Sequence, residues 1–561
     1  MEKIVALCRR RGFIFGSSEI YGGIGGFWDY GPLGTELKRN IKDAWWQDMV
    51  RNPPIGPNGV EYQMVGLDCS IIMNPKVWEA SGHVGGFSDP MVDCKECKGR
   101  FRVDQVYTLF ILDGPGIEHI DDAIDYHSRH PRDEIKPLIM EAFAAGLEAN
   151  SINEALDGAF DAVRAASKAR NVGKFKKFSP SVELRGLDSS SGSLFCKTHA
   201  GESFRLYIEP LQTDNLGTSR PCPNCHAENS LTEPREFNLM FETFVGALQD
   251  STSKAYLRPE TAQGIFANFK NVMDSTRVKI PFGIAQIGKA FRNEINPRNY
   301  TFRSREFEQM EIEFFCKPDE LCGPGEVKAI EWYEFWRDVR IAWYESLGIK
   351  SDKLRPRKQG EDELAHYSKA CTDIEYLFPF SDEPQELEGV AHRGSFDLEA
   401  HGLSARGKKE AFAVIDDATK QRFVPHVIEP SAGVDRFALA TITEAYSYDE
   451  SRASPEFMKF HPRLAPIKAA VFPLVAKDGM PEIAEPIYRE IRKHFNCQYD
   501  AKQSIGKRYA RMDEAGTPFC FTIDGQTKED GTLTVRDRDD ASQIRIDKSQ
   551  CLKYLRDKLE L

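Results

Sequence analysis

Apolar residues recur at intervals of three and four between residues 33 and 50. They are Leu33, Leu37, Ile41, Ala44, Trp45 and Met49. This spacing puts them on one face of a helix, so the sequence predicts a long amphipathic helix here. An extended stretch over Glu61–Met73 follows and stops at Asn74-Pro75, because proline interrupts regular structure.

Residues 105–220 follow a different pattern, which predicts an inserted and mostly helical subdomain. Ser151 and Glu154 form a capping box, a signature of a helix start. The apolar residues after it form one helical stripe: Ile152, Leu156, Ala159, Val163 and Ala166. A helix is therefore expected over 151–169, and a basic run, Lys168–Lys177, continues from it.

The end of the chain alternates strand and helix patterns, which predicts a small α/β domain over 465–561. Strands are expected over 469–475, 519–524 and 532–537, and an amphipathic helix over 482–494. Alternating elements of this kind favour a mixed sheet. Residues 1–104 and 221–455 then form one α+β core that the insertion interrupts.

Composition favours an ordinary globular protein over a membrane-spanning or disulfide-rich one. The apolar, charged and aromatic fractions are those of an ordinary globular protein, and no stretch approaches the ~20 apolar residues of a membrane-spanning helix. Thirteen cysteines, an odd number and scattered, favour a reducing cytoplasm over a disulfide framework. The net charge of −12 does not suggest a nucleic-acid binder, so any RNA partner requires locally basic surface.

Three segments carry the candidate chemistry: Phe291–Glu294, Phe302–Glu311 and Glu429–Arg436. If the second is a strand, its side chains alternate between two faces. One face then holds the residues Arg303, Arg305, Phe307, Gln309 and Glu311. Cations suit phosphates, an aromatic ring suits a base and a carboxylate suits an amine, so this face fits a nucleotide with an amino acid. The alternative is a solvated, salt-bridged strand.

These segments resemble motifs 2 and 3 of the class II aminoacyl-tRNA synthetases, and the details are similar to the homodimeric glycyl-tRNA synthetases. The supporting strings are Ile20–Gly23, Trp28–Gly34, Trp78–His83, Arg258–Gly264 and Pro425–Arg436. The helix and strand over 33–73 match motif 1, which in that family forms the dimer interface; a core helix without a partner is the alternative. The resemblance implies a class II antiparallel-sheet core, the helical insertion and a C-terminal anticodon-binding domain.

The resemblance implies a set of ATP-binding residues. Arg292 would hold the α-phosphate, Arg303 the far end of a bent triphosphate, and Phe307 and Arg436 the two faces of adenine. Arg292, Arg303 and Arg436 are therefore the expected catalytic residues, and Glu386 and Glu429 the expected Mg²⁺ contacts. The whole expected ATP site is Arg292, Asn293, Glu294, Phe302, Arg303, Ser304, Arg305, Glu306, Phe307, Glu386, Leu387, Gly433, Val434, Asp435 and Arg436.

The resemblance also implies a glycine pocket. Glu260, Glu311 and Ser431 would line its ammonium site, and Arg102, with Arg393 as a second candidate, would meet the carboxylate. The expected pocket comprises Arg102, Glu260, Phe307, Glu308, Gln309, Met310, Glu311, Glu429, Pro430, Ser431, Ala432 and Gly433. The chain departs from the family at Arg393-Gly394-Ser395, where Thr-Asp usually follows the arginine, and this puts the local hydrogen bonding in doubt.

Two Cys-x-x-Cys pairs, Cys94/Cys97 and Cys222/Cys225, flank the insertion. Four thiolates in two such pairs form a tetrahedral structural zinc site. Two alternatives stay open: reduced cysteines in a site that has lost its metal, or replacement of one pair by Cys196 and His199.

The expected function is that of a cytoplasmic, homodimeric glycine–tRNA ligase without a membrane partner, which uses glycine, ATP and tRNA(Gly). The alternative is a non-catalytic paralogue that keeps the fold as a nucleic-acid-binding accessory subunit. Such a paralogue would be expected to lose the phosphate arginines and the amine-binding acids, which this chain retains.

Overall fold

The structure is a computed structural model of the 561-residue chain. It describes residues 1–102, 106–112, 126–127, 182–188, 193–198, 203–210, 222, 225, 227, 230–247, 249–250, 253–360, 363–365, 368–452 and 454–559. The chain divides into a core unit, Met1–Val84 with Met240–Leu561, and an inserted unit, Gly85–Leu239.

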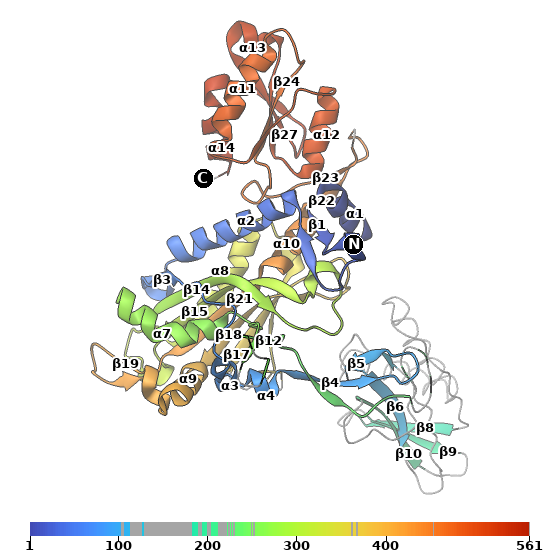
Figure 1. The fold of residues 1–561 in the computed structure, drawn as a ribbon, viewed down its shortest axis with the longest axis vertical. Coiled ribbons are helices and arrows are strands. Elements are labelled where there is room, and N and C mark those ends of the chain that lie inside the picture. Colours follow the sequence, from blue (N-terminus) through green and yellow to red (C-terminus); the bar gives the residue numbers. More distant parts are fainter. Residues whose placement is uncertain are drawn as a thin grey trace. The chain divides into compact units, whose positions relative to one another are not determined.

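In the described part of the core unit, seven strands form the central sheet, in the order β16-β17-β18-β21-β15-β14-β3 (Figure 1). Their bounds are β3 Gln63–Gly66, β14 Phe282–Phe291, β15 Glu306–Cys316, β16 Leu354–Lys358, β17 Ala370–Tyr376, β18 Gln385–Gly394 and β21 His426–Gly433. All neighbours pair antiparallel except β14 and β3, which are parallel. The predicted antiparallel core is confirmed.

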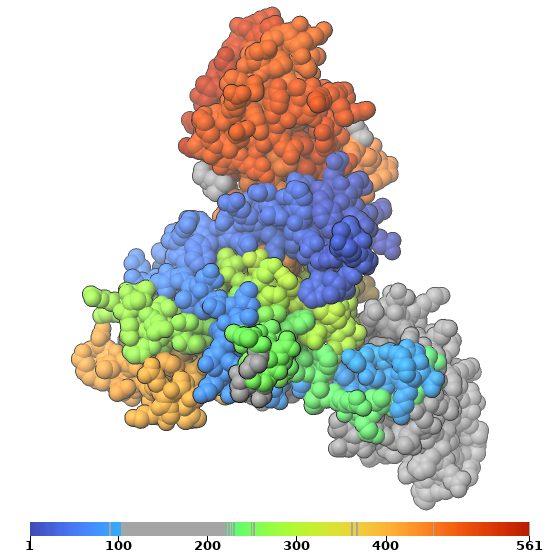
Figure 2. Space-filling model, viewed as in Figure 1, coloured from blue at the N-terminus to red at the C-terminus, as the bar shows by residue number. Residues whose placement is uncertain are grey.

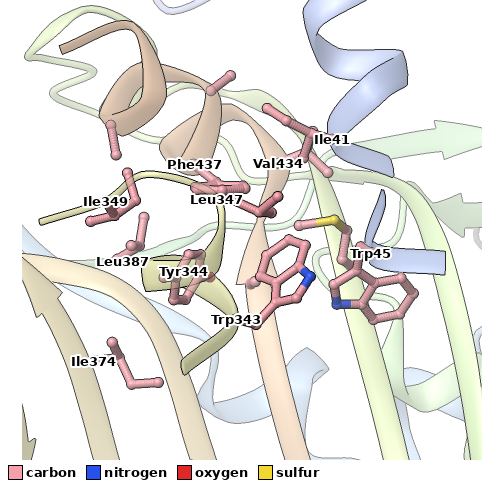
Figure 3. Close-up of a cluster of buried hydrophobic side chains, with 14 of the residues drawn as sticks. Ile41, Trp45, Trp343, Tyr344, Leu347, Ile349, Ile374, Leu387, Val434 and Phe437 are labelled. Carbon is pink, nitrogen blue, oxygen red and sulfur yellow. The ribbon is translucent and has the colours of Figure 1, made fainter. Parts of the chain in front are cut away.

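One face of this sheet is covered by α2 (Pro32–Trp46), α8 (Ala329–Ser346) and α10 (Val434–Ala445). Figure 3 shows Trp45 of α2, Trp343 of α8 and Phe437 of α10 gathered in the apolar layer between them. Burying such large side chains stabilises the fold by roughly 1.5–3 kcal/mol each. The predicted helix over 33–50 is thus α2, continued by a π-helical turn, Gln47–Arg51.

The other face packs against α7 (Ala262–Thr276) and α9 (Phe396–Arg406). Phe315 of β15 joins this layer, whereas its neighbour Phe314 joins the first. The strand therefore sends odd-numbered side chains to one face and even-numbered ones to the other. Because Phe307, Gln309 and Glu311 are odd-numbered, they lie on the α7–α9 side of the sheet.

The remaining elements of the core unit before residue 459 are short. The helices are α1 Glu2–Arg11, α3 Lys76–Ala80 and α4 His83–Gly86, whose end lies across the boundary. The strands are β1 Ile14–Gly16, β2 Trp28–Tyr30, β12 Glu242–Phe244, β13 Lys254–Tyr256, β19 Val414–Ile415, β20 Arg422–Phe423, β22 Tyr446–Tyr448 and β23 Glu456–Met458. The extended stretch predicted over 61–73 contains only β3 as a strand, because its ladder with β14 covers only residues 63–66.

The C-terminal domain has the sheet order β25-β24-β26-β27-β28, and its parallel and antiparallel pairs confirm the mixed sheet. The strands are β24 Ala469–Pro473, β25 Cys497–Tyr499, β26 Phe519–Ile523, β27 Thr532–Asp537 and β28 Gln543–Asp547; the helices are α11 Met480–Ile491, α12 Ile505–Ala515, α13 Gly525–Asp530 and α14 Cys551–Leu559. All four predicted elements are present. Phe460, Leu464 and Ala465 belong to the apolar layer that contains Trp45, Trp343 and Phe437, so that layer extends beyond the predicted boundary at 455.

The inserted unit holds two sheets in its described residues. One has the order β11-β4-β5, with β4 Ser88–Asp93, β5 Arg100–Arg102 and β11 Arg235–Asn238. The other has the order β7-β6-β10-β9-β8, with β6 Val106–Leu112, β7 Tyr126–His127, β8 Val182–Asp188, β9 Ser193–Thr198 and β10 Ser203–Pro210. The unit begins before 105 and ends after 220, because β4 and β11 pair with each other.

The sequence predicted helices rather than this five-stranded sheet. The helix expected over 151–169 and the basic run after it lie outside the described residues. Every described residue between 106 and 210 lies in a strand. Single strands of six to eight residues with little alternation give a weaker sequence signal than one long amphipathic stripe.

Candidate active site

A cavity of about 480 Å³ lies in the core unit, where β15, β18 and β21 run side by side. Most of the predicted site residues line it: Arg292, Glu294, Phe302, Arg303, Ser304, Phe307, Gln309, Glu386, Leu387, Glu429, Ser431, Gly433, Asp435 and Arg436. The sheet brings them together because β21 pairs with β15 on one side and β18 on the other. Segments more than a hundred residues apart thus share one cavity.

Three arginines give the cavity its cationic region. The Arg292 guanidinium lies 5.4 Å from the centre of the Phe307 ring, and its Nε donates to the carbonyl of Pro259 at 3.0 Å. Arg436 lies over the Phe302 ring at 4.5 Å, and its Nη1 is 3.2 Å from an oxygen of Glu386. Arg436 is the main reason that the pKa of Glu386 is lowered. Permanently charged, planar forks of this kind suit a polyphosphate.

Arg305 does not line the cavity. Its Nε donates to the carbonyl of Glu294 at 2.8 Å and its Nη1 to the carbonyl of Gly25 at 2.7 Å. The sequence placed Arg305 on the same face as Arg303 by assuming that both residues lie in a strand. That assumption is wrong, because β15 begins only at Glu306. Arg305 therefore stabilises the loop before β15. Of these two arginines, Arg303 is the one that lines the cavity.

Several predicted side chains point away from the cavity. Met310, Ala432 and Val434 lie in the apolar layer beneath α2, α8 and α10. Glu308 forms ion pairs with Lys38 and Lys42 of α2 at 3.1 and 2.9 Å, and Glu306 pairs with Lys289. These five side chains do not line the cavity. On β15 the reason is that even-numbered positions face the opposite side of the sheet. A part for these residues in binding stays a prediction.

Three further predictions have other outcomes. Asn293 and Pro430 belong to the expected strings but do not line the cavity. Arg102 ends β5 of the inserted unit, so it lies in a different unit from the cavity. Its pairing with a carboxylate of glycine stays a prediction.

Buried carboxylates lie beside the cationic region. Glu311 accepts from Ser431 Oγ at 2.8 Å and from Thr261, and Arg393 Nη1 donates to Glu429 at 2.7 Å. Burial raises the pKa of Glu311, and it raises that of Glu429 to about 8 against the opposing effect of Arg393. A cationic amine among these acids would restore the balance of charge.

Glu260 lies near the same acids and is held differently. Gln263 Nε2 donates to it at 2.9 Å, and His83 Nε2 lies 3.5 Å from its other oxygen. Burial opposes the charged form, but His83, Arg393 and Gln263 together outweigh it and the pKa of Glu260 is lowered. Glu260 is therefore an ionised carboxylate inside the protein.

Sequence reasoning missed Asp397 and Glu313. Asp397 accepts from Arg393 Nε at 2.8 Å and from Gln263 Nε2 at 3.0 Å, so it supplies the hydrogen bonding that the Gly394-Ser395 departure put in doubt. Glu313 is fully buried, and neither of its oxygens has a hydrogen-bond partner among the described residues. Its odd position on β15 was the available signal, since it continues the row of Gln309 and Glu311.

The four cysteines of the two pairs come together in the inserted unit. Sγ of Cys94 lies 3.6 Å from Sγ of Cys225, and Sγ of Cys97 lies 3.6 Å from Sγ of Cys222. All four sulfurs lie within 4.8 Å of one another. Sulfurs around a tetrahedral zinc ion with Zn–S bonds of about 2.3 Å are roughly 3.8 Å apart, so the group fits that metal.

The structure describes only one of the two alternative ligands. Cys196 is in the middle of β9 and opposite Phe204 of β10, whereas His199 is outside the described residues.

Burial opposes ionisation of Cys94, but Ser230 and the backbone N–H of Cys97 lower the pKa of its thiol to about 6. A thiol that ionises readily is the form that binds a metal.

Comparison with known proteins adds to this picture. Residues 241–446 match the tRNA synthetase class II core domain (G, H, P, S and T), and residues 468–558 match an anticodon binding domain. The chain is 47% identical to the glycine–tRNA ligase of Rhodopirellula baltica, over 97% of each chain. It is 43% identical to that of Acetivibrio thermocellus, over 100% of this chain and 98% of the relative, and 43% identical to that of Bacillus cereus, over 100% and 99%.

Proposed function

The chain belongs to the glycine–tRNA ligase family of class II synthetases, and on that premise we propose that the cavity on β15, β18 and β21 is where glycine is joined to ATP. The enzyme activates glycine as glycyl-adenylate and transfers it to tRNA(Gly). The observation that carries the assignment of the cavity is its two-part lining, with arginines at one end and buried acids beside them. The first suits a polyphosphate and the second an amine.

The arginines bring two anions together. The carboxylate of glycine attacks the α-phosphorus, and negative charge builds on the phosphate oxygens. Fixed cations aimed at that charge stabilise the transition state. Arg292 takes the α-phosphate, Arg303 the far phosphates, and Phe307 stacks on the adenine; Arg436, held over Phe302, closes the adenine side. No general base is needed, because the carboxylate of glycine is ionised at neutral pH.

Magnesium accompanies ATP as its counter-ion. Glu386, which is half exposed in the cavity, and Glu429 would hold it with oxygen ligands, the kind that Mg²⁺ prefers. When bound, the ion neutralises phosphate charge. Arg436 already pairs with Glu386 at 3.2 Å, so this arginine fixes the direction in which the carboxylate faces.

Glycine is recognised by its amine and by exclusion. Glu260, Glu311 and Ser431 surround the ammonium group, and Arg393 keeps Glu429 beside them at 2.7 Å. Arg102 and Arg393 remain the candidates for the substrate carboxylate. The proposed pocket rejects larger amino acids by steric clash, because overpacking costs about 1–3 kcal/mol.

The accessory-subunit alternative is not supported. Full-length relatives carry the name glycine–tRNA ligase, and the three phosphate arginines that a non-catalytic paralogue would lose line one cavity together with Glu429.

Pyrophosphate exchange with each amino acid in turn tests the assignment. We expect exchange with glycine, and a rate with alanine roughly 10- to 200-fold lower, which is the discrimination one methylene allows. The other amino acids should give background rates. Exchange that favours alanine or serine over glycine would contradict the proposed pocket.

Structural zinc is the proposed occupant of the four-cysteine group. Elemental analysis should find about one zinc ion per chain, and the double change Cys94→Ser with Cys222→Ser should remove it. Cys322→Ser is the matched control, since Cys322 lies outside the group. Protein that contains no zinc as purified, with full activity, would show that the cysteines no longer hold metal.

The other partners are also proposals. We propose a cytoplasmic homodimer through α2, which Figure 2 shows in blue at the surface of the core unit, with Arg39 and Asp43 exposed. The described residues contain no helix suited to cross a membrane. The C-terminal domain would bind the anticodon. Lys502 and Lys507 are exposed there, whereas Arg508 is buried on the carbonyls of Pro473, Leu474 and Asp500 and cannot reach a phosphate.

A further inference from the structure

The string Trp78–His83 has no part in the chemistry above, yet the structure places its last residue against the pocket. His83 Nε2 lies 3.5 Å from an oxygen of Glu260. Glu260 itself comes from the loop before α7, far along the chain. The contact therefore joins two segments that share nothing in sequence.

The local backbone explains the spacing of the string. Helix α3 ends at Ala80, and Ser81 follows in a helical conformation. Gly82 then has φ +81°, a conformation that a side chain would strain, although nothing occupies the space where a Cβ would lie. This reversal brings the side chains of Ser81 and His83 together, with Ser81 Oγ 2.8 Å from His83 Nδ1.

Contacts with neighbouring side chains fix the orientation of the His83 imidazole. The buried Trp78 ring meets it edge to face, with 5.5 Å between ring centres. A carboxylate accepts hydrogen bonds only, so Nε2 must carry the proton that faces Glu260. Nδ1 accepts from the hydroxyl of Ser81 when the ring is neutral and donates to it when the ring is protonated.

Glu260 has one polar neighbour at each oxygen. Gln263 Nε2 donates to Oε1 at 2.9 Å, and His83 faces Oε2. Gln263 is itself fixed by Asp397 and by His401 at 3.0 and 2.8 Å. Without His83, one oxygen of a carboxylate that is only 14% exposed loses its donor, which is costly inside a protein.

We propose that His83 is a positioning residue for glycine recognition, which holds the Glu260 carboxylate in the orientation that accepts the substrate ammonium. This inference rests on the proposed role of Glu260 in the glycine pocket. The proposal gives each residue at the end of the string a role. Ser81 orients the imidazole, Gly82 makes the turn and His83 holds the carboxylate.

Three variants test it by glycine-dependent pyrophosphate exchange. His83→Leu removes the donor, and we expect the KM for glycine to rise roughly tenfold, as for a lost charge-assisted hydrogen bond, while the KM for ATP stays unchanged. His83→Gln should restore most of the affinity, because its amide nitrogen can take the place of Nε2. Ser81→Ala should shift the KM for glycine in the same direction by a smaller factor.

Other outcomes overturn it. An unchanged KM for glycine in His83→Leu would show that the contact does not position Glu260. A parallel rise in both KM values, or a lower melting temperature with no rescue by glutamine, would show that His83 only supports packing. Wild-type protein without glycine-dependent exchange would instead overturn the proposed function, so the two failures are distinguishable.

Discussion

Replacing Arg292 by alanine should lower the rate of glycyl-adenylate formation by about 10²–10³-fold, the usual effect of losing one fixed donor at the site where charge develops. The fold should be unaffected, because Arg292 contacts a carbonyl and the edge of the cavity rather than the apolar layers. Single-turnover adenylate formation measures the effect directly. Arg292→Lys should recover only part of it, since an ammonium cannot form the two parallel bonds of a guanidinium.

Arg489→Ala is the matched control. It also removes one arginine, but Arg489 lies on the surface of α11 in a pair with Glu485. Adenylate formation should stay at the wild-type rate. A wild-type rate in Arg292→Ala as well would remove Arg292 from the proposed phosphate site.

Arg340→Met should destabilise the core unit by about 3–5 kcal/mol, the cost of leaving a buried charge without its partner. Arg340 and Glu388 are 0% and 1% exposed and lie 2.7 Å apart between α8 and β18. Tyr344 donates to the same carboxylate at 2.5 Å. Guanidinium unfolding, followed by tryptophan fluorescence, should show the core transition at a lower denaturant concentration.

The double change Arg340→Met with Glu388→Met separates charge from packing. It removes both ions at similar volume, and apolar replacements of buried pairs are often neutral or stabilising. The free energy of unfolding should therefore return most of the way to the wild-type value. A deficit should remain, because Tyr344 loses its hydrogen bond to Glu388. Equal destabilisation of the single and double variants would mean that the effect comes from packing.

The sequence predicted the site best where a strand carries it. Period-two alternation placed Phe307, Gln309 and Glu311 on one face, and β15 confirms that from Glu306 onward. The same rule failed for Arg305, three residues after a 3₁₀ turn at Tyr300–Phe302, since alternation holds only inside the ladder. Listing whole motif strings also included Glu308 and Met310, whose side chains face α2 and the apolar layer.

Other site residues could not be found from one sequence. His83 contacts Glu260 from a distant segment, and no local pattern marks such a partner. Asp397 lies only four residues after Arg393, but the sequence does not show which nearby polar side chain the arginine meets. Glu313 looks like an ordinary polar position of a strand until its burial is known. In the C-terminal domain, Arg508 directly follows the exposed Lys507, but its own side chain turns inward to three carbonyls. Charge counted along the chain does not show which side chains reach solvent.

The order of strands in the central sheet has a consequence for how the chain is made. β21 lies between β15 and β18, but it leaves the ribosome last of the three. At ~5–20 residues per second, β21 follows β15 by on the order of 10 s. Until then β15, and later also β18, expose an unpaired backbone edge, a template for aggregation. A nascent chain that stalls before His426 cannot close the sheet, so shielding by chaperones is needed most over this interval of translation.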